Sequence, residues 1–325
     1  MKINPMWDKY PLIEHELGLT LALMQKNIKT DNEPVSKAIL EMINSGGKLL
    51  RPAYLLLFSM FQKTDRNKII ALAAAIEILH MATLIHDDVI DESPTRRGMS
   101  SIQKQFGQST AVYSGDYLFV VCFNLLAEYA SDFRGIQQYG HHMNAILNGE
   151  MTQMVERYDL NISIDQYFKQ ISGKTGQLFS LATFLGAYES GNKIKFAKNA
   201  EKIGLNIGVS FQLMDDILDY TDNSQQIGKP VHNDMREGVY SAPLILAMAQ
   251  HKDLFFPFLK KKNKMTDQDT EEIAKLVIEF DGIKKAKKYA ETYTKKALIQ
   301  INDLPDKPAK KALIDITREL LDRQS

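Results

Sequence analysis

The sequence has little cysteine and no excess of either charge. Cys122 is the only cysteine in 325 residues, which excludes a disulfide framework. It lies in the apolar run YLFVVCFNLLAEYA, where a lone thiol is usually a small buried residue. The 40 basic and 40 acidic residues give a formal net charge of +0, so no global field recruits nucleic acid. Any electrostatic recognition is therefore expected in a local site.

Long apolar runs are also scarce. None is expected to cross a bilayer, and the first residues carry Pro5, Asp8, Pro11 and Glu14 where a secretory signal has its apolar core. The lysine-rich stretches KKKNK and IKKAKKYAETYTKKALIQ are amphipathic and have acids nearby, which favours a solvated helix face. We therefore expect a cytoplasmic protein whose membrane contact is at most peripheral.

Strand-like alternation of apolar and polar residues is nearly absent. Apolar residues instead recur at spacings of three and four, which predicts helices, over residues 12–28, 35–43, 68–90, 109–130, 136–157, 164–188, 195–220 and 240–255. The breakers between these segments are short, and no shift in composition marks a domain boundary. We predict an all-α fold, one bundle of about ten or more helices that forms a single domain over residues 1–325.

A concentration of charge ends the helix predicted over residues 68–92. The sequence LIHDDVIDESPTRRG places three aspartates and two arginines within residues 84–98. On a helix, His80, Asp87 and Asp91 lie within about 40° of one another, on the mainly apolar stripe that faces inward. Carboxylates there repel each other and are costly to desolvate, which indicates a bound cation, most simply Mg²⁺. The alternative is an exposed acidic helix end.

The same D-D-x-x-D spacing returns at Asp215, Asp216 and Asp219, in a second apolar helix that has Gln212 on the same face. Two such helices facing each other would form a site for several Mg²⁺ ions and a diphosphate. Arginine forks and lysine ammonium groups suit a diphosphate, and the candidates near turns are Lys48, Arg51, Arg96 and Arg97. Each alone is more often an ordinary surface residue, so only the combination is informative.

Two familiar motifs are excluded. GKT at residues 173–175 lacks both the earlier glycine and the preceding strand of a phosphate-binding P-loop, so Lys174 and Thr175 are interpreted as mid-helix donors or structural residues. EILH at residues 77–80 has the E-x-x-H spacing of a di-iron bundle, but no second such motif exists. His80 is better interpreted as a core or phosphate-binding histidine.

In combination these motifs resemble those of the trans-polyprenyl diphosphate synthases, over about residues 40–245. The resemblance rests on GGKLLRP, LIHDDVIDESPTRRG, GDYLF, GKTGQL, FQLMDDILDY and GKPVHNDMREG, which occur in family order. It implies an all-α domain with a deep central cavity in which the two aspartate helices face each other. Two or three Mg²⁺ ions would hold an allylic diphosphate there.

The resemblance also implies a role for each site residue. The metal ligands would be Asp87, Asp91, Asp215 and Asp219, and the catalytic set adds Asp88, Arg96, Lys174 and Asp216. The allylic diphosphate would be bound by Arg96, Lys174, Thr175 and Gln212. Isopentenyl diphosphate would be bound by Lys48, Arg51, His80 and Arg97, and Lys229 is a further substrate-binding lysine.

The implied reaction lengthens a prenyl chain. Diphosphate departs from the allylic substrate, the double bond of isopentenyl diphosphate attacks the cation, and a proton is lost. The growing tail would pass Ile76, Leu79, Ala82 and Thr83, where short-chain relatives place a blocking aromatic residue. Small Ala82 and Thr83 leave this path open, which predicts a product of about six to eight isoprene units. The expected enzyme is a heptaprenyl diphosphate synthase, primed by farnesyl diphosphate, for quinone side chains such as that of menaquinone; a geranylgeranyl or hexaprenyl synthase is the alternative.

One departure from the family pattern concerns G-K-x-T-x-P, which reads GVYSAP here, with Val239 for the lysine and Ser241 for the threonine. The catalytic large subunit, component II, of two-subunit heptaprenyl synthases resembles this variation. We therefore expect a small regulatory subunit, component I, as partner, with a homodimer as the alternative. A class I terpene cyclase is disfavoured because the second cluster lacks that family's motif. A non-catalytic regulatory subunit is disfavoured because both clusters are intact.

Overall fold

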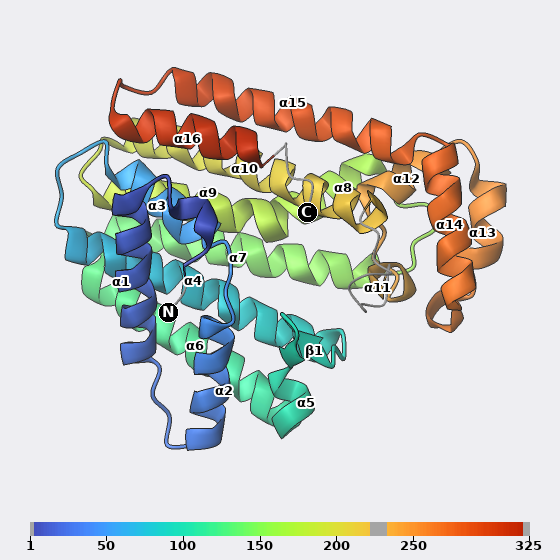
Figure 1. Cartoon of the computed structure of the whole chain (residues 1–325), viewed down its shortest axis with the longest axis horizontal. Helices are drawn as coiled ribbons and strands as arrows, with labels where there is room; N and C mark the ends of the chain where they lie inside the picture. The colour runs from blue at the N-terminus through green and yellow to red at the C-terminus, as the bar shows by residue number, and fades with distance from the viewer. Residues whose placement is uncertain (1–2, 222–232, 321–325) are drawn as a thin grey trace. The chain divides into compact units, whose positions relative to one another are not determined.

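The computed structural model describes residues 3–221 and 233–320 and is almost entirely helical (Figure 1). The first part contains η1 (Pro5–Trp7), α1 (Pro11–Asn27), α2 (Glu33–Asn44), α3 (Leu50–Ser59), α4 (Arg66–Ile90), β1 (Thr95–Arg96), β2 (Met99–Ser100), α5 (Ile102–Phe106), α6 (Gln108–Tyr129) and α7 (Phe133–Val155). The rest contains α8 (Ile164–Ile171), η2 (Ser172–Gly176), α9 (Gln177–Glu189), α10 (Ile194–Thr221), α11 (Asn233–Arg236), α12 (Ala242–Met248), α13 (Lys252–Leu259), η4 (Lys262–Lys264), α14 (Asp267–Glu279), α15 (Gly282–Asn302) and α16 (Pro308–Glu319). The predicted all-α class is confirmed.

Local capping sets several of these helix starts. Asn32 accepts a hydrogen bond from the Val35 N–H at the start of α2, and Asp65 accepts one from the Asn67 N–H at the start of α4. Ser163 and Gln166 form a reciprocal capping box at the start of α8. These side chains satisfy backbone N–H groups that a helix start leaves without partners.

The chain divides into two compact units. Unit 1 comprises residues 1–140, 181–201 and 305–313, and unit 2 comprises residues 141–180, 202–304 and 314–325. The expectation of a single domain stays a prediction.

Unit 1 is organised around α4. This helix packs along α6 and also contacts α1 and α3, as can be followed in Figure 1. Ile69 to Leu79 is buried without interruption, because LAAAIEIL places small alanines and large aliphatic residues on every side of the helix. A helix that is apolar all round belongs in a core. The first aspartate cluster therefore extends from a rigid, buried helix.

Unit 2 has its own core around α10. Val209, Leu213 and Ile217 of α10 join a cluster of buried residues that includes Tyr167 of α8 and Phe255 of α13. Helix α12 packs against α15, whose Ala286 and Ala290 are fully buried and permit close approach. The second aspartate cluster thus also lies on a helix fixed by its apolar face.

Two of the predicted helices are divided in the structure. The segment predicted as one helix over residues 164–188 is α8 and α9 joined by η2, a single π-helical turn with the sequence SGKTG. The segment predicted over residues 240–255 is divided into α12 and α13. Residues 92–98, which lie between two of the predicted helices, include strand β1, which pairs with β2 in a short antiparallel hairpin.

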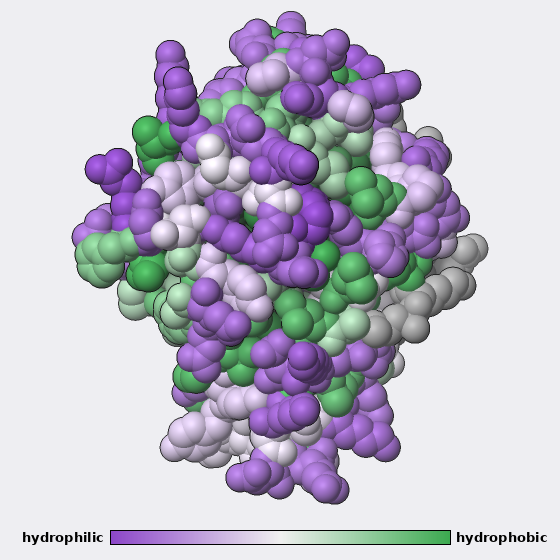
Figure 2. All heavy atoms as spheres, turned by 90° about the vertical axis from the view of Figure 1, so that its left-hand side faces the viewer, coloured by the Kyte–Doolittle hydropathy of each residue, from purple (hydrophilic) through white to green (hydrophobic). Residues whose placement is uncertain are grey.

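The expectation that no apolar run is long enough to span a membrane was wrong by length and composition. Helices α4 and α6 are each long and apolar enough to cross a membrane. The most apolar stretch of α4 is 78% buried, and that of α6 is 44% buried. The high burial of α4 identifies it as a core helix, for which the same composition is needed. Figure 2 shows hydrophilic side chains over much of one face of the molecule, with hydrophobic ones between them in small groups.

Candidate active site

The first aspartate cluster lies at the carboxyl end of α4. Asp88 is 2% exposed, and both Nε and Nη2 of Arg96 donate to its Oδ1, the Nε at 2.8 Å. Asp87 and Asp91 are half-buried, and Asp91 is the residue that caps the helix. The middle aspartate therefore ties the helix to the hairpin, while the outer two lie nearer the surface.

Burial raises the pKa of Asp88, and the hydrogen bonds and charge of Arg96 oppose the rise. Asp87 and Asp91 add to it by repulsion. Arg96 thus stabilises the charged form of a carboxylate that would otherwise be costly to bury.

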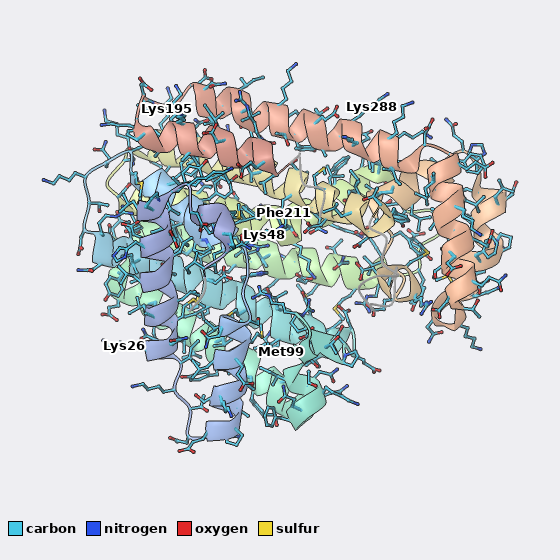
Figure 3. The ribbon with its side chains drawn as sticks, in the orientation of Figure 1. Lys26, Lys48, Met99, Lys195, Phe211 and Lys288 are labelled. Atoms are coloured by element: carbon cyan, nitrogen blue, oxygen red, sulfur yellow. The ribbon has the colours of Figure 1, made fainter. Side chains whose placement is uncertain are left out.

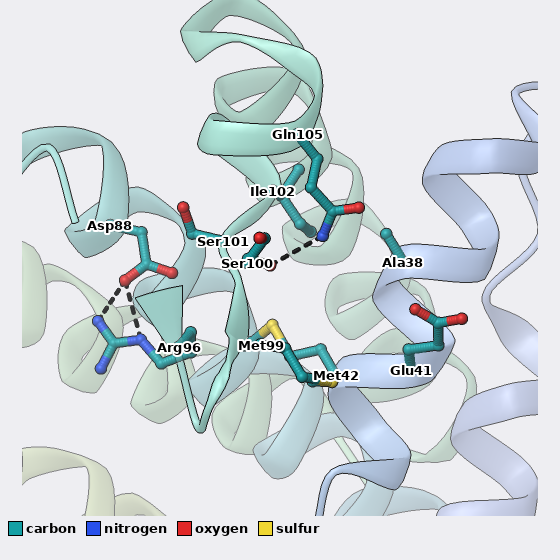
Figure 4. Close-up of a pocket in the computed structure, with 10 residues that line it drawn as sticks. All are labelled: Ala38, Glu41, Met42, Asp88, Arg96, Met99, Ser100, Ser101, Ile102 and Gln105. Carbon is teal, nitrogen blue, oxygen red and sulfur yellow. Dashed lines mark hydrogen bonds and ion pairs between the residues drawn. The ribbon is translucent and has the colours of Figure 1, made fainter. Parts of the chain in front are cut away.

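A tight hairpin holds Arg96 in this position. Arg96 of β1 pairs with Met99 of β2, and the turn residues Arg97 and Gly98 have φ of 51° and 77°. Two consecutive left-handed residues are typical of a two-residue hairpin turn. Figure 4 shows Arg96 directed at Asp88 beside a small pocket lined by residues of α2, β2 and α5.

Sequence reasoning missed the contacts that fix α4 just before the cluster. The His86 ring lies 3.2 Å from the Val112 carbonyl oxygen and 3.3 Å from Asp116 Oδ1, and it stacks on Phe119 with centroids 5.4 Å apart. Gly115 permits this approach, since a Cβ there would clash with three ring atoms of His86. The signal was present in GDYLF, which the motif comparison included without giving Gly115 or Asp116 a role.

The cations expected to bind isopentenyl diphosphate lie in unit 1. Lys48, labelled in Figure 3, comes from the loop before α3, and its carbonyl oxygen accepts a hydrogen bond of 2.8 Å from Trp7 Nε1. Arg51 and His80 are half-buried, on α3 and α4. The Arg97 guanidinium lies over Gly47, because a Cβ on Gly47 would be 3.2 Å from its Nη1 and Nη2. The loop at residues 45–49 and the hairpin therefore meet.

The residues expected to line the growing tail differ in exposure. Ile76, Leu79 and Ala82 are at most 1% exposed, whereas Thr83 is half-buried and its hydroxyl donates to the His80 carbonyl oxygen at 2.8 Å. Thr83 is thus the one of these four that reaches the surface of α4.

The second aspartate cluster lies on α10 in unit 2. Asp216 is 8% exposed; its Oδ2 accepts hydrogen bonds from Tyr167 Oη at 2.7 Å and from the Ala242 N–H at 3.2 Å, and its Oδ1 accepts one from Gln212 Nε2 at 2.9 Å. Burial raises the pKa of Asp216 to about 6, opposed by these three hydrogen bonds. Asp215 is half-buried and Asp219 is exposed. Sequence reasoning missed Tyr167, which no motif marks.

The π-helical turn η2 presents Lys174 and Thr175. Thr175 Oγ1 donates to Gln212 Oε1 at 2.8 Å, and Lys174 Nζ lies 2.9 Å from Glu150 Oε2. A Cβ on Gly208 would be 2.8 Å from Gly176 Cα, so only glycine lets α10 approach the turn this closely. Single π-helical turns often mark functional sites.

The segment that departs from the family pattern precedes α12. Val239 is half-buried, and its N–H donates to the Asp234 carbonyl oxygen at 2.8 Å. The Ser241 hydroxyl lies 3.1 Å from Tyr220 Oη. Lys229, expected as a substrate-binding residue, lies outside the described residues.

The two clusters have the same design in each unit. The second aspartate of D-D-x-x-D is buried and hydrogen-bonded, and the first and last are more exposed. Within residues 3–221 and 233–320, no group of three or more His, Cys, Asp or Glu side chains is arranged as a ready metal site. Carboxylate pairs of this kind suit Mg²⁺, which commonly takes one or two protein carboxylates together with water and substrate phosphates.

Known proteins resemble this chain both in sequence and in fold. A sequence profile of the polyprenyl synthetase family matches residues 32–279. Component 2 of the heptaprenyl diphosphate synthase of Bacillus subtilis is 29% identical over 97% of this chain and 91% of its own length. The crystal structure of a geranylgeranyl pyrophosphate synthase from Lactobacillus brevis has a TM-score of 0.93 and 42% identity, covering 98% of this chain and 99% of its own. A polyprenyl synthase from Caulobacter crescentus, complexed with calcium and isoprenyl diphosphate, has a TM-score of 0.90 and 30% identity over 97% of each chain.

The family match and the all-α fold thus define an isoprenoid-forming transferase. The chain belongs to the polyprenyl synthetase family and is a prenyltransferase. Its relatives include heptaprenyl, octaprenyl, nonaprenyl and geranylgeranyl diphosphate synthases, so family membership leaves the product length open.

Proposed function

We propose that the protein is a long-chain trans-polyprenyl diphosphate synthase, most similar to heptaprenyl diphosphate synthase, that adds isopentenyl diphosphate to an allylic primer such as farnesyl diphosphate. The observation that carries the proposal is the repeated design of the two aspartate clusters. Asp88 and Asp216 are buried and hydrogen-bonded, which orients the helical turn that carries the two outer carboxylates of each cluster. An acidic helix end with no further role does not require a buried and hydrogen-bonded second aspartate, and this chain has one in both clusters, at Asp88 and Asp216.

The donor set fits Mg²⁺, with two or three ions per site. Asp87 and Asp91 in one unit and Asp215 and Asp219 in the other are oxygen ligands, and no cysteine accompanies them, which favours a hard cation. When bound, the metal neutralises diphosphate charge and favours departure of this leaving group.

The chain's own residues account for the rest of the reaction. Lys174, held at η2 by Glu150, supplies a point charge for the allylic diphosphate, and Thr175 and Gln212 are already oriented by their hydrogen bond. Arg96 keeps donors beyond those used on Asp88 for the same group. Lys48, Arg51, His80 and Arg97 bind the diphosphate of isopentenyl diphosphate. The allylic carbon–oxygen bond breaks as diphosphate departs, and the double bond of isopentenyl diphosphate attacks the allylic carbon. The released diphosphate accepts the proton that the product loses.

We infer a product of about six to eight isoprene units from the small side chains before the first cluster. Thr83 is half-buried, whereas Ala82, Leu79 and Ile76 are buried. A larger side chain at position 83 would therefore be the first to meet the tail. A geranylgeranyl product is the second candidate, favoured by the 42% identity to the Lactobacillus brevis enzyme. A menaquinone or other quinone side chain is the expected use of the longer product.

Chain length is tested by sizing products after adding bulk to α4. Thr83→Phe and Ala82→Tyr are expected to shorten the product, because an aromatic ring blocks the path of the tail. Met81→Phe is the control, since position 81 is turned about 160° from position 83 on the helix. An unchanged product length in both test variants, with all proteins folded, contradicts the assignment of this wall.

We also propose that the chain works with a second subunit, a small component of the kind implied by the name of the Bacillus subtilis relative. Helix α6 carries a row of exposed apolar side chains, with Tyr113 74%, Val120 55% and Phe123 50% exposed. Their spacing of seven and three places them on one face of the helix. Exposed apolar faces of this kind are typical of protein contacts.

The assembly is tested by light scattering of the chain alone and mixed with a candidate small subunit. Tyr113→Asp combined with Val120→Asp is expected to weaken either a homodimer or the mixed complex. Ile299→Asp is the matched control, because Ile299 is 54% exposed on α15. Equal association of both variants would place the contact elsewhere. Activity with the chain alone decides whether Val239, in place of the usual lysine, makes the partner necessary.

A further inference from the structure

Tyr158 has a strained backbone conformation that the proposed reaction does not explain. It lies in the connection between α7 and α8, is half-buried, and has a φ of 61°. Bulky residues are rare in this left-handed region, because the Cβ crowds the following carbonyl oxygen. Such a conformation persists only where surrounding contacts enforce it, and these positions cluster at functional sites. Tyr158 belongs to none of the motifs on which the family resemblance rests.

Two hydrogen bonds join Tyr158 to the segment just before α12. Its N–H donates to the Gly238 carbonyl oxygen at 2.9 Å, and its hydroxyl donates to the Arg236 carbonyl oxygen at 2.8 Å. Gly238 has a φ of 81°, and a Cβ there would lie 2.6 Å from Cγ and Cδ1 of the Tyr158 ring. The Lys262 ammonium lies over the same ring, 5.4 Å from its centroid, a cation–π distance. The segment therefore approaches Tyr158 so closely that only glycine fits at position 238.

The same segment leads to the second aspartate cluster. The Ala242 N–H, four residues after that glycine, begins α12 and donates to Asp216 Oδ2 at 3.2 Å. Asp216 Oδ1 accepts from Gln212, whose Oε1 in turn accepts from the Thr175 hydroxyl at 2.8 Å. Backbone and hydrogen bonds thus connect the tyrosine with two side chains assigned to the allylic diphosphate, all within unit 2.

We propose that Tyr158 is a positioning residue for the allylic diphosphate subsite, on which it acts through the start of α12 and Asp216. This inference rests on the proposed function. Val239 offers no charge to a diphosphate where the family pattern has a lysine, so the segment contributes to the subsite through the placement of its backbone. A tyrosine that fixes this backbone before substrate binds pre-organises the subsite.

Tyr117 of α6 provides a matched control in unit 1. It is also half-buried, and its hydroxyl also donates to the backbone carbonyl oxygen of a distant residue, Lys29, at 2.7 Å. Neither Tyr117 nor Lys29 is assigned to substrate. Tyr158→Phe and Tyr117→Phe therefore each remove a hydroxyl that holds backbone in place, and only the first loosens the segment that leads to Asp216.

The first test is steady-state kinetics of the full-length protein, with its partner if activity requires one. In Tyr158→Phe we expect the KM for the allylic substrate to rise about threefold to tenfold, the effect of losing one hydrogen bond. The KM for isopentenyl diphosphate is expected to stay within about twofold, a difference that a general loss of stability would not produce. Tyr117→Phe should leave both KM values unchanged.

The second test requires no turnover. Hydrogen exchange of peptides spanning Val239 to Leu246 is measured by mass spectrometry in the absence of metal and substrate. Tyr158→Phe should speed exchange there about threefold or more, because the Ala242 N–H is held less firmly, and Tyr117→Phe should not. Gly238→Ala forces the Tyr158 ring away, so it should speed exchange and raise the allylic KM at least as much.

The inference is overturned if folded Tyr158→Phe leaves the allylic KM unchanged, changes both KM values equally, or does not alter exchange over residues 239–246. Wild-type protein in the same assay keeps the two proposals apart. No elongation by the wild type removes the proposed function, whereas normal elongation with an unresponsive allylic KM removes only the role of Tyr158.

Discussion

Gly115 on α6 offers a quantitative test of how the first aspartate cluster is held. In Gly115→Ala the new Cβ would lie 2.7 Å from Cε1 and 2.8 Å from Cδ2 of His86, and closer still to Nε2. The ring must therefore move. It then leaves Asp116 and the Val112 carbonyl oxygen, and its stacking on Phe119 is disturbed.

The magnitude follows from three contributions. Losing the contact with Asp116 and the stacking on Phe119 costs about 1–2 kcal/mol. Residual crowding adds about 1–3 kcal/mol. The better helix propensity of alanine returns about 1 kcal/mol. We therefore expect Gly115→Ala to lower the free energy of unfolding by about 1–4 kcal/mol.

The assay is urea-induced unfolding followed by circular dichroism, with Gly18→Ala as control. Gly18 is also mid-helix, but nothing lies within 4 Å of a Cβ placed there, so alanine should stabilise the protein by up to about 1 kcal/mol. In a His86→Ala background, Gly115→Ala should become stabilising as well. A Gly115→Ala protein as stable as Gly18→Ala would refute the reasoning.

Three further predictions concern the second cluster and the metal. Burial raises the pKa of Asp216 to about 6. Its contribution to the free energy of unfolding is therefore complete below its unfolded pKa of about 3.9, and on the order of 3 kcal/mol is lost as pH rises through about 6. Unfolding measured against pH in EDTA should show this fall in the wild type and not in Asp216→Asn, and parallel profiles of the two proteins would contradict it. Gly208→Ala should destabilise unit 2 by about 1–3 kcal/mol, because its Cβ meets backbone of η2, whereas Gly140→Ala, with open space around it, should not. Chelation of divalent ions should abolish prenyl transfer while leaving the helical circular dichroism intact, and residual turnover would argue against a metal role.

Helix periodicity predicted most of the fold because apolar residues recur at spacings of three and four through most of the chain. The segment predicted over residues 68–90 is α4 at Arg66–Ile90, and the one predicted over residues 195–220 is α10 at Ile194–Thr221. Periodicity failed at SGKTG: the apolar pattern continues on both sides of this segment, yet Gly173 and Gly176 permit a π-helical turn. The split between α12 and α13 was missed because apolar spacing continues across the break, which contains no glycine.

The candidate site was predictable where spacing alone determines chemistry. The two D-D-x-x-D repeats and the cations around them were identified from one sequence. The sequence did not show which aspartate of each cluster is buried and hydrogen-bonded. The partners of Asp88 and Asp216 are Arg96 and Tyr167, which lie eight and forty-nine residues away in the chain.

We propose above all that the outer aspartates of the two clusters support Mg²⁺-dependent chain elongation. The direct measurement is incubation of the protein, alone and with a candidate small subunit, with Mg²⁺, farnesyl diphosphate and labelled isopentenyl diphosphate, followed by sizing of the products. We expect long-chain products from the wild type and a loss of about 100-fold or more in Asp87→Ala, since metal stabilisation of the leaving group is worth several kcal/mol. No elongation under either condition, or near-normal turnover by Asp87→Ala at saturating Mg²⁺, would contradict the account.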